Sequence, residues 1–146
     1  MAHAIRRLKE TDAAAVFRVL EAARASSVVS IGPKWSYDQL ALECRESGLV
    51  TVLNGEVKAF ILWRDTGAAF EISFLATAPN AQGQGLMSAL LDDLKRHLPP
   101  DRQIWLEVHE QNQAARALYE SAGFKRTGQR AGYYADGATA ILYNYG

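Results

Sequence analysis

Residues 75–91, LATAPNAQGQGLMSALL, decide the fold, because the sequence changes there from a strand pattern to a helix pattern across a short glycine turn. The leucines that follow Gly85 recur at helical spacing until Pro99-Pro100 ends the helix. Backbone N–H groups at such a turn lie beside the positive end of the helix dipole, which suits them to phosphate or pyrophosphate. A glycine turn before a helix is more often only a turn, so this interpretation needs support from the rest of the chain.

Three strands precede the glycine turn and are predicted to form an antiparallel meander. Asn54-Gly55 is a strong hairpin signal between strands at residues 49–53 and 56–63. Residues 65–67 (DTG) turn the chain again, into a third strand at residues 68–77.

A strand and two helices are predicted before the meander. Residues 4–8 form the strand, and the first helix starts at Thr11-Asp12. After a break at Gly32-Pro33, a second helix runs from near Tyr37 to a point before Gly48. Its start shows capping-box spacing at Ser36 and Gln39 and hydrophobic-staple spacing at Trp35 and Leu40.

The last third of the chain is predicted to add a strand, a helix and a hairpin. Residues 103–108 alternate as a strand, with Glu107 on the face opposite the aliphatic row. Asn112 is an N-cap for the next helix, and Gly123 ends it. Strands at 125–134 and 138–145 then flank an Asp136-Gly137 turn.

The element order is therefore β-α-α-β-β-β-α-β-α-β-β, which predicts an α+β fold with a mixed, mostly antiparallel sheet and helices on both faces. At 146 residues, we expect residues 1–146 to form a single domain.

Composition excludes several classes of function. Sixteen basic and sixteen acidic residues cancel, so no global positive field draws the protein to nucleic acid or to an anionic membrane. Cys44 is the only cysteine and the three histidines, His3, His97 and His109, are widely spaced, so we expect no metal site. The chain shows no secretion signal and no apolar run of about 20 residues, so we expect a cytoplasmic protein.

Two blocks of sequence carry a family resemblance. Residues 82–87 (QGQGLM) resemble the (Gln/Arg)-x-x-Gly-x-(Gly/Ala) coenzyme-A loop of the GCN5-related N-acetyltransferase (GNAT) superfamily. Residues 105–112 (WLEVHEQN) and 117–124 (ALYESAGF) are similar to the RimI-type ribosomal-protein alanine acetyltransferases. The resemblance extends to residues 33–36 and to Tyr133-Tyr134.

This resemblance implies an acetyl-CoA-dependent N-acetyltransferase that acts by direct attack of an amine, with Glu107 as base and Tyr119 as acid. The strand would offer backbone groups to the pantetheine arm, and the glycine turn would hold the phosphates. The implied cofactor-binding residues are Leu75, Ala76, Thr77, Gly83, Gln84, Gly85, Leu86, Met87, Ser88 and Asn112. Met87 replaces a small residue of the family loop and Gly83 replaces a frequent arginine, which predicts weaker cofactor binding.

Each implied role has an alternative. Glu107 could be a solvated surface charge, Tyr119 a core aromatic and Asn112 only an N-cap. Glu71 is a second candidate base. Trp35, Tyr133 and Tyr134 could line an acceptor groove or simply pack on the sheet.

The expected acceptor is a protein N-terminus, and the RimI-type resemblance points to a ribosomal protein that begins with alanine. An internal lysine and a small amine are the other acceptors considered. A different class of function is a regulatory domain that binds acyl-CoA without turnover.

Overall fold

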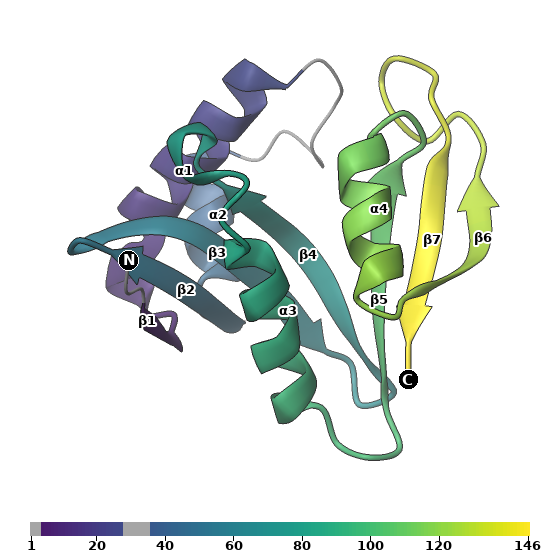
Figure 1. The fold of residues 1–146 in the computed structure, drawn as a ribbon, viewed down its shortest axis with the longest axis horizontal. Helices are drawn as coiled ribbons and strands as arrows, with labels where there is room; N and C mark the ends of the chain where they lie inside the picture. The colour runs from purple at the N-terminus through teal and green to yellow at the C-terminus, as the bar shows by residue number, and fades with distance from the viewer. Residues whose placement is uncertain (1–3, 28–35) are drawn as a thin grey trace.

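The computed structural model describes residues 4–27 and 36–146, which form one seven-stranded sheet with helices on both faces (Figure 1). The strand order is β1-β2-β3-β4-β5-β7-β6. The predicted break at Gly32-Pro33, the staple residue Trp35 and residues 33–35 of the resemblance lie outside the described residues.

The N-terminal elements follow the predicted order. Strand β1 (Ala4–Arg7) leads through a 3-10 turn into helix α1 (Ala13–Ser26), and helix α2 (Tyr37–Glu43) follows. The predicted capping box at the start of α2 is present, because the Ser36 hydroxyl accepts from the Gln39 N–H and the Gln39 side chain accepts from the Ser36 N–H.

Strands β2 (Ser47–Leu53), β3 (Glu56–Asp65) and β4 (Ala69–Thr77) form the predicted meander. Asn54 and Gly55 join β2 to β3 with φ angles of 53° and 80°, the positive values that a type I′ turn requires. A β-bulge interrupts the pairing of β3 with β4, since Leu62 pairs with Phe74 while Trp63 pairs with Ile72. Ser73 is therefore the extra residue on β4.

Helix α3 (Leu86–His97) follows the glycine turn, and strand β5 (Gln103–His109) and helix α4 (Gln113–Ser121) come next. Strand β7 (Ala140–Tyr145) lies between β5 and β6 (Lys125–Arg130), and both pairings are antiparallel. The prediction that the strand starting at Lys125 continues to Tyr134 is wrong, because residues 131–139 form a loop. In that loop the Tyr134 N–H donates to the Ala138 carbonyl and the Gly137 N–H donates to the Tyr134 carbonyl, while the Thr139 carbonyl accepts from the Glu110 N–H after β5.

Strands β4 and β5 separate along their length, and this separation positions the site. They pair in parallel only from Ala69–Gln103 to Glu71–Trp105. Figure 1 shows the two strands diverging beyond that point, with α3 and α4 in front of the sheet. Among the described residues, β5 does not pair with Leu75 to Thr77 of β4, so this edge of the sheet is open to a ligand.

The core lies between the sheet and its helices. The apolar stripe of α3 is buried through Leu86, Met87, Leu90, Leu91 and Leu94, as its spacing predicts. Figure 1 shows α2 behind the sheet, on the side opposite α3, and α1 contacts α2. None of the described helices is long and apolar enough to cross a membrane.

Candidate active site

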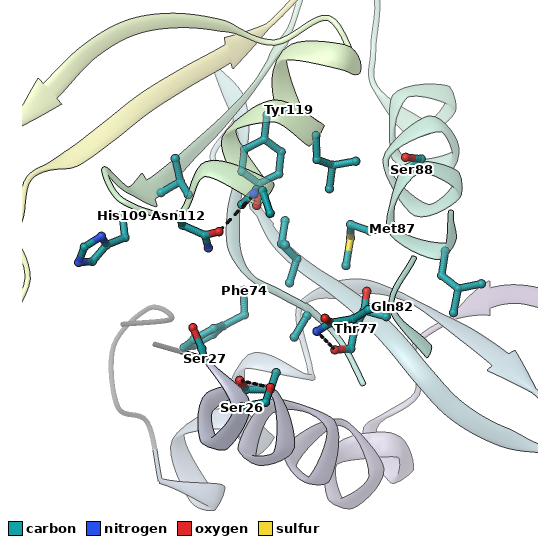
Figure 2. Close-up of a pocket in the computed structure, with 18 of the residues that line it drawn as sticks. Ser26, Ser27, Phe74, Thr77, Gln82, Met87, Ser88, His109, Asn112 and Tyr119 are labelled. Carbon is teal, nitrogen blue, oxygen red and sulfur yellow. Dashed lines mark hydrogen bonds between the residues drawn. The ribbon is translucent and has the colours of Figure 1, made fainter. Parts of the chain in front are cut away.

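A cleft of about 580 Å³ lies where β4 and β5 separate, and we call it the central cleft. Figure 2 shows Asn112 and Tyr119 on one side of it, Phe74 and Thr77 on another, and Met87 and Ser88 at the start of α3. Ten of the twelve predicted site residues line it: Leu75, Ala76, Thr77, Gly83, Gly85, Leu86, Met87, Ser88, Asn112 and Tyr119. Gln84 and Glu107 do not.

The glycine turn has the backbone geometry expected of an anion-binding loop. Gly83 and Gly85 have φ angles of 79° and 76°, and a Cβ at either position would meet no atom within 4 Å. Space beside the turn is therefore open, and the first N–H groups of α3 face it without partners within the helix. The Gln82 amide donates to the Thr77 carbonyl and ties the turn to the end of β4.

Asn112 caps α4, as predicted, because its side-chain oxygen accepts from the Ala115 N–H at 3.2 Å. Its position in the central cleft means that it is both a cap and a lining residue. Gly123 ends α4 with a φ of 91°, and the Phe124 N–H reaches back to the Tyr119 carbonyl at 2.9 Å. These two end contacts fix the helix that carries Tyr119.

Tyr119 is almost fully buried and packs against the rings of Phe124 and Tyr143, each 6.0 Å away between centroids. Figure 2 shows its ring pointing from α4 into the central cleft. Burial raises the pKa of Tyr119, and the nearby Tyr134 raises it further. The phenol therefore stays protonated at neutral pH.

A second hollow of about 540 Å³ lies on the other side of the separating strands, and we call it the outer groove. Both candidate bases, Glu107 and Glu71, line it together with Trp105 and Tyr133. Trp105 and Tyr133 expose 42% and 48% of their surface, so two large rings are available to a bound chain.

Glu107 is exposed on β5, opposite the buried Leu106 and Val108, as the alternation predicts. The closest cation is Arg130, with its Nη2 3.5 Å from Glu107 Oε1. Burial raises the pKa of Tyr133, and the hydrogen bond and charge of Glu107 raise it further. Glu107 thus lies beside Trp105 and Tyr133 in the outer groove, with solvent on one side.

The central cleft and the outer groove meet at two residues, Ser73 and Tyr134, which line both. Burial raises the pKa of Tyr134 to about 12, with further contributions from Glu107, Tyr133 and Asp136. A group held in the central cleft can thus meet a group held in the outer groove at this junction. The arrangement suits transfer between two substrates that enter from opposite sides.

Sequence reasoning missed a buried ionic cluster in the outer groove. The Glu43 carboxylate, whose side chain is 5% exposed, accepts from Arg64 Nε at 2.8 Å and Nη2 at 2.7 Å and from the Ser73 hydroxyl at 2.8 Å. Burial opposes ionisation of Glu43, but the hydrogen bonds from Arg64 and Ser73 outweigh it and lower its pKa. No local pattern marks these residues, because they lie 21 and 30 positions apart.

A second missed contact holds the loop that carries Tyr133 and Tyr134. His109 is buried, and its Nε2 lies 2.8 Å from Asp136 Oδ2, while its Nδ1 accepts from the Gln111 N–H. The His109 ring also lies against Tyr134, at 4.9 Å between centroids. This contact fixes the loop over the junction of the two hollows.

Two further findings concern thiol and metal-binding side chains. Cys44 caps α2 and is buried, and burial raises the pKa of its thiol to about 11, which leaves it an unreactive packing residue. Residues 4–27 and 36–146 hold no group of three or more His, Cys, Asp and Glu side chains placed to bind a metal.

Comparison with known proteins identifies the family of the chain. Residues 3–124 match the family model described as "Acetyltransferase (GNAT) family". The chain is 35% identical over 134 residues to [ribosomal protein bS18]-alanine N-acetyltransferase of Escherichia coli strain K12, covering 87% of this chain and 84% of that protein.

Two solved structures share the fold of this chain. The crystal structure of the ribosomal-protein-S18-alanine N-acetyltransferase from Escherichia coli matches with a TM-score of 0.83 and 30% identity, over 98% of this chain and 92% of that one. A Salmonella typhimurium structure described with its cofactor acetyl-CoA shares the fold, with a TM-score of 0.76, 22% identity and coverage of 99% and 94%. The chain belongs to the acetyltransferase (GNAT) family and is an enzyme of the acyltransferase class.

Proposed function

We propose that this protein transfers the acetyl group of acetyl-CoA to the α-amine of a protein N-terminus, with residues 1–146 as its single catalytic domain. The observation that carries the proposal is the junction at Ser73 and Tyr134, where a cleft built for the cofactor meets a groove lined by carboxylates and aromatic rings. The 35% identity to a bS18-alanine N-acetyltransferase supports an N-terminal amine as acceptor.

The central cleft would hold acetyl-CoA through backbone groups. The free edge of β4 from Leu75 to Thr77 would pair with the amides of the pantetheine arm as an added strand would. The turn from Gly83 to Ser88 would hold the pyrophosphate on N–H groups at the start of α3, where the helix dipole favours an anion. Gln84 does not line the cleft, so its predicted part in cofactor binding rests on the family resemblance alone.

In the outer groove, Glu107 would deprotonate the incoming amine. An α-amine with a pKa near ~8 is mostly protonated at neutral pH, and only its free lone pair attacks a thioester. Glu107 would take the proton directly or through water, a contribution of order 10²–10⁴ in rate. Glu71 lines the same groove and is the alternative base.

Tyr119 would complete the proton balance from the other side. As the amine nitrogen bonds to the carbonyl carbon and the carbon–sulfur bond breaks, the nitrogen loses its second proton and the departing thiolate needs one. Tyr119 would give its proton to the sulfur, and the proton lost by the nitrogen would return to the phenolate through water. The raised pKa of Tyr119 keeps its phenol protonated for this step. A strand N–H near Ala76 or Thr77 would stabilise the developing oxyanion, and no covalent acetyl-enzyme is required.

The acceptor that this proposal favours is a ribosomal protein that begins with alanine, by similarity to the bS18-alanine enzyme. Such an acceptor would place the enzyme in the cytoplasm. A lysine side chain or a small amine would enter the same groove.

The test mixes the protein with acetyl-CoA and short peptides that begin with Ala, Ser or Met, and follows release of free thiol. Thiol release that depends on the peptide is the expected result. Tight acetyl-CoA binding without thiol release for any amine would instead show a regulatory acyl-CoA-binding domain.

A further inference from the structure

The fold places Ser73 at a position that the alternating pattern of strand β4 does not predict. It is the extra residue of the β-bulge in β4, and bulges next to active sites commonly turn a side chain out of the strand pattern. The residue is half-buried and lines both the central cleft and the outer groove. The acetyl donor and its acceptor would therefore meet beside it.

The hydrogen bond of Ser73 to Glu43 fixes what its hydroxyl can do. Arg64 binds both carboxylate oxygens of Glu43, so the carboxylate is ionised and can only accept hydrogen bonds. The Ser73 hydroxyl, 2.8 Å away, must therefore donate its one hydrogen bond to Glu43. Its oxygen lone pairs are left as acceptors at the junction.

We propose that Ser73 is an acceptor-binding residue that receives one N–H of the incoming amine, and that Glu43 and Arg64 are positioning residues that act through it. This inference rests on the proposed function. A neutral primary amine carries two N–H groups and one lone pair. An acceptor for one N–H at the junction turns the lone pair toward the thioester carbon, and this kind of orientation lowers the barrier to attack.

The contacts of Arg64 and Ser73 stabilise the buried charge of Glu43 beside the outer groove. Glu43 is almost fully covered, whereas the Arg64 side chain is 59% exposed and the Ser73 hydroxyl is the third partner. An unpaired buried carboxylate is costly, so the arrangement persists only with all its partners in place. With the carboxylate fully paired, the groove presents an oriented hydroxyl oxygen at this position.

The experiment measures steady-state rates of thiol release with acetyl-CoA and an Ala-initial peptide for the wild-type protein and for Ser73→Ala, Ser73→Thr and Glu43→Gln. Removing one hydrogen-bond acceptor is expected to lower kcat/KM for the peptide roughly tenfold in Ser73→Ala. Ser73→Thr keeps a hydroxyl and is expected to retain most activity. The acetyl-CoA KM is expected to stay within about twofold of wild type, because the amine alone loses a contact.

The double variant Ser73→Ala/Glu43→Gln tests whether Glu43 affects the reaction only through Ser73. If Glu43 acts through Ser73, Glu43→Gln lowers kcat/KM for the peptide in the wild-type background and adds nothing in the Ser73→Ala background. Additive losses would assign Glu43 a separate role and overturn this part of the inference. Ser121→Ala, at an exposed position at the end of α4, is the matched control and is expected to behave as wild type.

Two other results would contradict the inference in distinguishable ways. An active wild-type protein whose Ser73→Ala variant keeps full kcat/KM for the peptide would exclude Ser73 as an acceptor-binding residue and leave the proposed function standing. A wild-type protein that binds acetyl-CoA but releases no thiol with any amine would overturn the proposed function, and the role of Ser73 with it.

Discussion

Glu107 and Tyr119 line different hollows of the protein, the carboxylate in the outer groove and the phenol in the central cleft. One is exposed on β5, and the other is buried on α4. This separation suits a reaction in which a proton leaves the acceptor on one side and a different proton reaches the leaving group on the other. It also means that the two residues can be tested independently.

Glu107→Gln keeps the shape of the side chain and removes the base. We expect kcat/KM for an Ala-initial peptide to fall by roughly 10²-fold at pH 7 and to recover in part above pH 8, where more of the amine is already neutral. The measurement is a pH–rate profile. Glu71→Gln is the comparison, since Glu71 lines the same groove. Loss of activity in Glu71→Gln with near wild-type rates in Glu107→Gln would assign the base to Glu71.

Tyr119→Phe removes the acid and leaves the ring in place. We expect kcat to fall by roughly 10²-fold with little change in acetyl-CoA affinity, and high pH should not restore it. Because burial raises the pKa of Tyr119, the wild-type phenol stays protonated on the alkaline side, and the rate should not decline there up to about pH 10. Tyr37→Phe, an exposed tyrosine on α2, is the control. An unchanged kcat in Tyr119→Phe would exclude the phenol as the acid.

Gly85→Val tests the phosphate-binding turn. A β-branched residue disfavours the φ of 76° and would narrow the open space beside the turn, so we expect the acetyl-CoA KM to rise at least tenfold. Gly67→Val is a matched control, because Gly67 also has a positive φ of 86° with nothing near its Cβ, but lies in the turn between β3 and β4. A folded Gly85→Val variant with an unchanged KM would place the pyrophosphate elsewhere.

Met87 has a packing role that its place in the loop does not reveal. It is 7% exposed and belongs to the buried stripe of α3, so Met87→Ala is expected to cost about 2–5 kcal/mol of stability. For a protein of this size, that is a fall in Tm of roughly 5–15 °C by thermal unfolding. Leu42→Ala, at a position 61% exposed, should change the Tm little. Equal Tm values for the two variants would show that Met87 contributes no packing.

Asp12 gives a pH-dependent contribution to stability. Its hydrogen bond to Arg6 lowers its pKa in the folded state from 3.8, although burial opposes this and the Lys9 N–H assists it. The stabilisation is therefore fully present above the unfolded pKa and is lost as the pH falls through the folded value. Asp12→Asn should lower the Tm at pH 7 and have little effect near pH 2, whereas the exposed control Asp101→Asn should have little effect at either pH. Equal Tm differences at both pH values would rule out this ion pair as the cause.

The parts of the fold predicted from sequence are those whose interactions are local. Asn54-Gly55 and the Ser36–Gln39 capping box specify structure within four residues, and both were predicted and are confirmed. The order of elements follows from the same kind of signal repeated along the chain, and the family assignment is confirmed by the match to residues 3–124.

The parts that could not be predicted depend on contacts between distant residues. The strand predicted to reach Tyr134 ends at Arg130, and the loop that follows is held by Asp136 against His109, 27 positions earlier. The Glu43–Arg64–Ser73 cluster joins α2, β3 and β4 across a bulge that leaves no mark in the sequence. The roles of Glu107 and Tyr119 came from resemblance alone, and they stay predictions.

The measurement that tests the central claim most directly is mass spectrometry of a single peptide that begins with alanine and contains one internal lysine, after incubation with acetyl-CoA and the protein. Fragmentation locates the added acetyl group. The proposal predicts acetylation of the α-amine, no reaction of the lysine, and no reaction of the same peptide with its N-terminus already blocked. Acetylation of the lysine with the α-amine left free, or no acetylation of either amine, would contradict it.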